Sequence, residues 1–237
     1  MKILYIYNIS WFFCSHRLST AKRLIDDGYD IYLVCKNAKK EDKEIIKKAG
    51  IKLYELNLKR GFSNLIIDIY HMFKLIKIIN KINPDITEIA TIKPIIIAGL
   101  IYRFNNRKVV FWLSGLGYIF TSKKIFILFL KKIILIVYKF IFNNYNSKVI
   151  LENIEDQNYL ISKKILDKSN SIVLPGSCVD IDKYNYVKEP KKIKVLMPSR
   201  LLWNKGVGDY IEAIKILRKK KIDCDFLLAG MTDNNPT

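Results

Sequence analysis

The sequence predicts an α/β protein with a doubly wound parallel sheet, and three observations support that class. Short apolar runs recur along most of the chain, stretches with helical periodicity separate them, and 50% of the 237 residues are hydrophobic. Apolar runs that alternate with helices are typical of parallel βαβ units. The chain is long enough for one complete domain and part of another.

The strands of this sheet are predicted where short apolar runs lie between turn residues, at Ile3–Asn8, Asp30–Lys36, Ile51–Asn57, Ile86–Thr91, Lys108–Ser114, Lys148–Asn153 and Ser171–Pro175. The helices between them are predicted near residues 15–28, 41–49, 63–82, 94–104, 124–142 and 154–163. In a doubly wound sheet, ligands bind at the carboxyl ends of the strands. We therefore expect a crevice lined by the loops that follow Tyr7, Thr91, Ser114, Asn153 and Pro175.

A second domain is predicted after a linker. The segment Asp182–Lys194 is polar, contains Pro190 and interrupts the apolar pattern, as interdomain linkers do. We expect a first domain over residues 1–182, a linker over 183–192 and the start of a second domain over 193–237.

This second domain is predicted to open with one βαβ unit. A strand is expected at Ile193–Pro198, a helix near 206–220 and another strand at Phe226–Ala229. A unit of this size cannot bury both faces of its sheet. The sequence therefore predicts a C-terminally truncated chain.

The chain is strongly basic. It has 41 Lys and Arg residues against 22 Asp and Glu, which gives a formal net charge of +19. A field of this sign favours phosphate-rich partners, namely nucleic acid, anionic lipid headgroups or phosphate-bearing substrates. Because the chain is also rich in Ile and Asn, a compositional bias of the source genome is an alternative explanation for the lysines.

Metal and disulfide chemistry are not expected. The 4 cysteines form no C-x-x-C pair, and their usage fits a reduced, cytosolic setting. The apolar stretch at the N-terminus is too short for a signal peptide. Two Asp-x-Asp matches, Asp180–Asp182 and Asp223–Asp225, are not expected to hold a metal, because two carboxylates alone rarely complete a site for a hard cation.

The loop after the first strand, Asn8–Arg17, lacks a G-x-G-x-x-G motif. Without those glycines the backbone cannot approach a pyrophosphate closely, which counts against an NAD-dependent enzyme. His16 and Arg17 are expected at the start of a helix, facing the crevice. His16 is a candidate for orienting a substrate hydroxyl or transferring a proton, and a structural hydrogen-bonding role is the alternative.

Further crevice residues are predicted after the fourth and fifth strands. Pro94 suits the first turn of a helix, and Lys93 beside it is expected to project a cation toward the crevice. Gly115 and Gly117 place backbone where a substrate can touch it. For each of these positions a plain turn is the alternative.

The loop Pro198–Gly206 connects a predicted strand to a predicted helix in the second domain. Such a loop directs backbone N–H groups and the helix dipole at an anion, and Arg200 and Lys205 add charge-assisted bonds. Gly206 at the helix entry favours this reading over a solvated basic loop. The loop therefore predicts a diphosphate site.

Taken in order, several segments resemble family 4 retaining GT-B glycosyltransferases. They are Thr91–Pro94, Ser114–Phe120, Asn153 with Asp156, Leu174–Asp180, and Ser199–Arg200 with Lys205–Gly206. Within that family the chain is similar to bacterial enzymes that build capsule, O-antigen of lipopolysaccharide or lipid-linked oligosaccharides. The resemblance covers essentially the whole chain, and such ordered agreement is more specific than any single motif.

The resemblance implies a GT-B fold, with one complete Rossmann-like acceptor domain and the first βαβ unit of a donor domain. It implies that Arg200, Lys205 and Gly206 bind the diphosphate of a nucleotide-sugar donor, UDP-linked, and that the two cations stabilise the departing nucleotide. It also implies anomeric retention without a metal or a cofactor. The residues expected on the acceptor side of the cleft are His16, Arg17, Lys93, Gly115, Gly117, Asn153 and Gly176.

Two features depart from the family pattern. Cys178 stands where the family usually has glycine, and the two-glutamate segment that grips the donor's ribose and phosphates is absent. An inactive acceptor-binding fragment is therefore one alternative. A basic nucleic-acid-binding protein is another, but the chain has no helix-turn-helix, zinc or RNA-binding signature, so no nucleic-acid partner is expected.

Residues 124–142 form the most hydrophobic stretch of the chain. Lys124, Lys131, Lys132 and Lys139 fall on one side of the predicted helix, and Phe126, Phe129 and Phe140 gather on the other. The lysines interrupt the run, so a bilayer span is not expected. We expect peripheral attachment to an anionic membrane at its cytoplasmic face, with an ordinary packed helix as the alternative.

Overall fold

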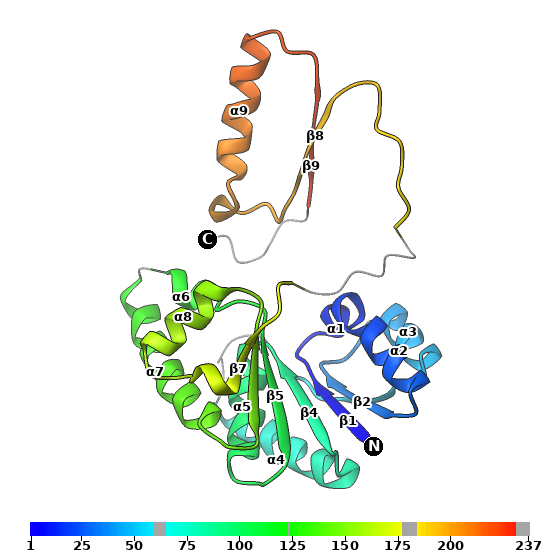
Figure 1. Ribbon diagram of the computed structural model, residues 1–237, viewed down its shortest axis with the longest axis vertical. Helices are drawn as coiled ribbons and strands as arrows, with labels where there is room; N and C mark the ends of the chain where they lie inside the picture. Colours follow the sequence, from blue (N-terminus) through cyan, green and yellow to red (C-terminus); the bar gives the residue numbers. More distant parts are fainter. Residues whose placement is uncertain (59–64, 123, 177–183, 231–237) are drawn as a thin grey trace. The chain divides into compact units, whose positions relative to one another are not determined.

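The computed structural model describes residues 1–58, 65–122, 124–176 and 184–230. The chain divides into two compact units, Met1–Asp180 and Ile181–Thr237 (Figure 1). The predicted Asp180–Asp182 motif and Cys178 lie outside the described residues.

The first unit is built on a parallel sheet of 7 strands in the order β3-β2-β1-β4-β5-β6-β7. Its strands are β1 (Lys2–Ile6), β2 (Asp30–Cys35), β3 (Lys52–Glu55), β4 (Ile86–Ala90), β5 (Lys108–Leu113), β6 (Ser147–Leu151) and β7 (Ser171–Val173). The doubly wound class predicted from the sequence is confirmed. Each strand ends slightly before its predicted boundary, because the last predicted residues belong to the loops at the carboxyl edge.

Helices cover both faces of this sheet. They are α1 (Ser10–His16), α2 (Leu18–Asp26), α3 (Lys40–Lys48), α4 (Leu65–Ile82), α5 (Ile92–Arg103), α6 (Tyr118–Thr121), α7 (Ile125–Phe142) and α8 (Ile154–Ser162), with the 3₁₀ turn η1 (Lys168–Asn170). The strand order reverses between β1 and β4, so right-handed crossovers place α1–α3 on one face and α4, α5, α7 and α8 on the other (Figure 1).

Residue alternation along β1 shows why the sheet is buried on both sides. Leu4 and Ile6 belong to the core beneath α4, α5 and α7, whereas Tyr5 and Tyr7 belong to the core beneath α1–α3. Successive side chains of a strand point to opposite faces. A strand covered on both faces therefore reads as an uninterrupted apolar run, which is the pattern from which it was predicted.

The helix predicted over 15–28 differs from the structure. Two helices, α1 and α2, meet at Arg17, whose backbone is not helical (φ −129°, ψ −13°). His16 is the last residue of α1 and Arg17 is the N-cap of α2, so the predicted helix start is wrong for His16 and correct for Arg17. The side chain of Arg17 contacts residues that are distant in the sequence, Glu88 and Trp112.

The second unit contains two parallel strands and the helix between them. β8 (Lys194–Pro198) pairs with β9 (Asp225–Ala229), and η3 (Trp203–Lys205) precedes α9 (Val207–Lys219). The Tyr210 hydroxyl donates to the carbonyl of Val195 at 2.8 Å, which ties the helix to β8.

Candidate functional site

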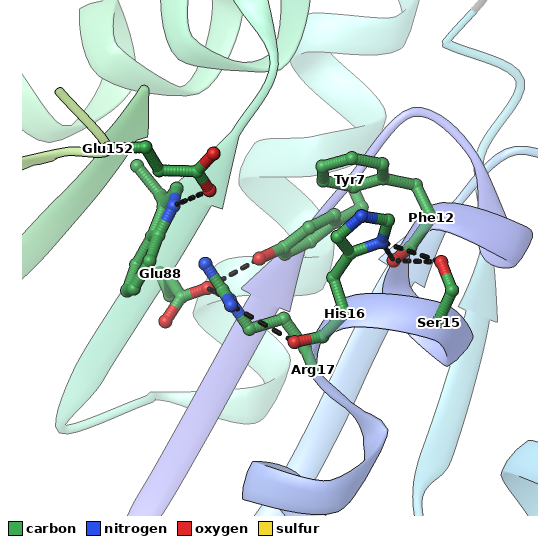
Figure 2. A network of polar contacts seen from close by, with 8 residues as sticks. Tyr7, Phe12, Ser15, His16, Arg17, Glu88 and Glu152 are labelled. Carbon is green, nitrogen blue, oxygen red and sulfur yellow. Dashed lines mark hydrogen bonds and ion pairs between the residues drawn. The ribbon is translucent and has the colours of Figure 1, made fainter. Parts of the chain in front are cut away.

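The carboxyl ends of β1 and β4 carry a buried ion pair. The Tyr7 hydroxyl donates to Glu88 Oε1 at 2.5 Å, and Arg17 Nε donates to the same oxygen at 3.1 Å (Figure 2). The Arg17 side chain is 4% exposed and that of Glu88 is 15% exposed. The strand order reverses between these two strands, which is where doubly wound proteins bind ligands.

Arg17 extends this network across the sheet. Its guanidinium carbon lies 3.4 Å from the centre of the Trp112 ring, and Nη1 donates to the carbonyl of His16 at 3.0 Å. Trp112 Nε1 in turn donates to Glu152 Oε1 at 2.9 Å. Because Glu152 follows β6, one connected set of contacts fixes the ends of β1, β4, β5 and β6.

Burial sets the protonation of this network. Burial raises the pKa of Glu88, and the Tyr7 hydrogen bond and the Arg17 charge oppose that rise. Burial and the nearby Glu88 carboxyl raise the pKa of Tyr7 well above its usual value, so Tyr7 stays a neutral donor. Since Arg17 is neutralised by Glu88, it positions the crevice and is not presented as a cation for a ligand.

His16 lies beside this network at the end of α1 (Figure 2). Its Nδ1 is 2.6 Å from Ser15 Oγ and 3.1 Å from the carbonyl oxygen of Phe12, and its ring stacks on Phe12 with 4.3 Å between centroids. These contacts engage Nδ1 and fix the plane of the ring. The ring is half-buried, so its outer edge reaches solvent.

Backbone strain and unsatisfied polar atoms occur at the same edge. Thr91 follows β4 with φ 71° and ψ 148°, and a positive φ is uncommon for a β-branched residue. Among the described residues, Thr91 Oγ1 and Asn8 Oδ1 are buried without a hydrogen-bond partner. Strain of this kind persists where the surrounding structure enforces it and is frequent at functional sites.

Lys93 does not project into the crevice as predicted. Its ammonium lies 2.6 Å from Asp68 Oδ1 on α4, and both side chains are buried. Its charge is therefore directed at a carboxylate of α4. The pair instead joins the first turn of α5 to the first turns of α4.

Asn153 and the predicted glycines shape the loops around the crevice. Asn153 caps α8 by accepting the Asp156 N–H at 2.7 Å, and Asp156 Oδ2 accepts the Leu116 N–H at 3.2 Å. Gly115 and Gly117 therefore flank a residue that is anchored to the first turn of α8. Gly176 follows β7 with φ 73°.

The loop between β8 and α9 carries the predicted diphosphate residues. The side chains of Arg200 and Lys205 are both exposed. Gly206 adopts the left-handed conformation (φ 76°) as the residue before α9, which explains the glycine there. A second close approach occurs at Gly230, where an added Cβ would lie 1.7 Å from the carbonyl oxygen of Ser199.

The family of the chain follows from a comparison with known families. The model of a family described as glycosyl transferase 4-like matches residues 2–153, which include every residue of the buried network. The chain belongs to the glycosyl transferase 4-like family. No curated protein sequence matches the chain.

Solved structures support the GT-B fold of this glycosyl transferase 4-like chain. HepE from Anabaena, in complex with UDP and glucose, superposes with a TM-score of 0.71 at 17% identity and covers 98% of this chain. Sucrose-phosphate synthase from Thermosynechococcus elongatus superposes with a TM-score of 0.69 at 14% identity, and the match covers 100% of this chain. A glycosyltransferase from Rickettsia africae superposes with a TM-score of 0.65 at 19% identity, and the match covers 97% of this chain. The chain spans 62%, 64% and 60% of these three proteins, respectively.

The two carboxylates of the second Asp-x-Asp match are paired with a lysine. Lys192 Nζ lies 3.1 Å from Asp223 Oδ1 and 2.9 Å from Asp225 Oδ1, which neutralises part of their charge. Across the described part of the chain, no three His, Cys, Asp or Glu side chains gather as a metal site.

Sequence reasoning missed Tyr7, Glu88, Trp112 and Asp68 in this glycosyl transferase 4-like chain. A signal for Glu88 was present, because it is a charged residue inside the apolar strand sequence Ile86–Ala90. Charged side chains are seldom buried unless they are paired. The strand therefore indicated a buried partner, although nothing local identified it as Arg17.

Proposed function

We propose that this chain takes part in transferring a sugar from a UDP-linked donor to a lipid-linked or polysaccharide acceptor, with retention of anomeric configuration and without a metal. The observation that carries the donor assignment is the β8–α9 loop, with exposed Arg200 and Lys205 ahead of a helix N-terminus. Its likeness to a protein bound to UDP and glucose supports the same donor class.

In the proposed reaction, the loop acts on the leaving group. Negative charge develops on the nucleotide diphosphate as the bond to the sugar breaks. Cations placed at that position stabilise the transition state more than the ground state. Arg200 and Lys205 supply those charges, and the first N–H groups of α9 add hydrogen bonds.

The first unit is proposed to hold the acceptor. Glu88, Arg17 and Trp112 fix the α1–α2 junction, and the Phe12 and Ser15 contacts fix the ring of His16. We assign His16 to holding an acceptor hydroxyl or taking its proton, since a half-buried imidazole with one nitrogen engaged is suited to both.

The reaction is proposed to occur at the cytoplasmic face of a membrane, with residues 124–142 in peripheral contact. On α7, Phe126 and Phe129 are 74% and 61% exposed instead of packed on the sheet. Lys131 was predicted on the lysine side of this helix, but its side chain turns inward. Its Nζ donates to the carbonyl oxygen of Phe120 at 3.3 Å. Among the described residues, no helix combines the length and apolar character needed to cross a bilayer.

Titration calorimetry with UDP tests the donor assignment. We expect the 237-residue chain to bind UDP, and the Arg200→Ala/Lys205→Ala variant to bind it at least about tenfold more weakly, because two charge-assisted contacts are lost. Lys219→Ala/Lys220→Ala removes the same charge from exposed positions at the far end of α9 and is the control. Equal UDP affinity in both variants would refute the assignment.

A further inference from the structure

The outer surface of α4 changes from apolar to basic along its length. In its first half Tyr70 and Phe73 are 54% and 58% exposed. In its second half Lys74, Lys77 and Lys81 are exposed. At about 3.6 residues per turn, these five side chains lie on one stripe of the helix.

The outer surface of α7 has the same two components. Phe126, Phe129 and Ile136 are exposed along its length, and exposed Lys132 and Lys139 border them. Both helices pack against α5, so they belong to one helix layer on the same face of the sheet. Two apolar patches therefore lie on that layer, one on each side of α5.

Neither surface carries exposed negative charge. Asp68 is the one acidic residue of α4, and it is buried against Lys93. The sequence of α7 has no acidic residue. Surfaces that combine exposed aromatic side chains with lysines, and that lack acidic groups, are complementary to an anionic lipid interface.

The apolar half of α4 lies at the edge of the sheet that carries the crevice. Helices of βαβ units run antiparallel to the strands, so their N-terminal halves lie at the carboxyl edge. The buried Lys93–Asp68 pair holds the start of α4 against the start of α5 at this edge. Tyr70 and Phe73 therefore lie nearer than Lys77 and Lys81 to the carboxyl edge, where the crevice is expected.

We propose that α4 is a second membrane-contacting element, which binds an anionic phospholipid bilayer together with α7. Tyr70 and Phe73 enter the interface, and the lysines of α4 contact lipid phosphates, with their stems along the surface. The inference rests on the proposed membrane association of the chain. Its consequence is that the crevice opens next to the lipid surface, where the sugar-bearing headgroup of a lipid-linked acceptor lies.

Vesicle flotation of the full 237-residue chain tests this inference. The vesicles contain phosphatidylcholine alone or with about one third phosphatidylglycerol, a composition that provides an anionic surface. We expect binding to the anionic vesicles, and a loss of at least about fivefold in Tyr70→Ser/Phe73→Ser, because two exposed aromatic anchors are removed. Phe126→Ser/Phe129→Ser should lose a similar amount.

The chain offers a matched control pair at the opposite edge. Phe104 and Tyr145 are 80% and 82% exposed and lie at the amino edge of the sheet, so Phe104→Ser/Tyr145→Ser removes the same two ring types without affecting the proposed contact. A second variant, Lys74→Gln/Lys77→Gln, keeps the rings and should weaken binding to anionic vesicles alone. Circular dichroism melting of each variant checks that it is folded.

Each outcome separates the inference from the proposed membrane association. If wild type floats and only the α7 pair loses binding, α4 is not a contact and the association stands. If wild type does not float, the association itself fails. If Phe104→Ser/Tyr145→Ser loses as much vesicle binding as the α4 pair, the proposed orientation of the helix layer on the membrane is wrong. If the α4 pair instead changes the molar mass measured by light scattering without lipid, the surface binds a second copy and the inference is wrong.

Discussion

Two cationic pairs, one in each unit of the molecule, differ in their surroundings. In the first unit, Arg17 and Lys93 are buried and each is paired with a carboxylate from a distant segment. In the second unit, Arg200 and Lys205 are exposed on one loop. Buried, paired charges hold elements in place, whereas exposed charges can be neutralised by a ligand.

Glu88→Ala should give the largest effect, because it leaves the buried Arg17 charge without its partner. Removing one member of a buried pair costs about 3–5 kcal/mol of unfolding free energy. Asp27→Ala breaks an exposed pair with Arg23 and should cost less than about 1 kcal/mol. Urea unfolding measures both. Equal losses would contradict the distinction between buried and exposed charge.

The pH dependence of the same carboxyl gives a smaller effect. The folded-state pKa of Glu88 is raised above its ordinary value of 4.5, so its contribution to stability is fully present below that value and is lost as pH rises through the raised pKa. Glu88→Gln does not titrate. The unfolding free energy of wild type minus that of Glu88→Gln should therefore decrease from pH 4 to neutral, by at most about 1.4 kcal/mol per pH unit. An increase would show that the Arg17 charge outweighs burial.

Gly206→Ala probes the second unit through its backbone. Gly206 is left-handed at φ 76°, and the added Cβ would meet only Asp209 Oδ2, at 3.6 Å. The cost should therefore be conformational and about 1 kcal/mol. Thermal unfolding measures it, with Gly208→Ala as a steric contrast, because there the Cβ would lie 2.9 Å from the Trp203 ring. A neutral Gly206→Ala would show that the loop adopts another conformation in solution.

The smallest expected effect is on stability when Arg200 and Lys205 are both replaced by alanine. Substitutions of exposed surface residues usually change the unfolding free energy by less than about 0.5 kcal/mol. The variant should therefore unfold at the same urea concentration as wild type while its UDP affinity falls. A loss above about 1 kcal/mol would show that these cations serve the fold.

The sequence was sufficient for the sheet and most helices, because apolar periodicity is a local property of the chain. It predicted a helix near 154–163, but it assigned Asn153 to the preceding strand, whereas the structure makes its side chain the cap of α8. It did not identify the partners of Arg17 and Lys93, which are Glu88 and Asp68. A charged residue in a loop gives the same local pattern whether it faces solvent or a buried carboxylate, so only the tertiary structure separates the two.

The Arg17–Glu88 pair also has a consequence for the order of folding. Its partners are 71 residues apart in the chain, and β4 reaches β1 only after the crossover through α4 has closed. Closing so long a loop is an entropic cost that precedes any gain from the contact. The α1–α2 junction should therefore acquire its final geometry late, when the two halves of the sheet join. A nascent chain that ends before β4 contains His16 but lacks the partner that sets the geometry of that junction.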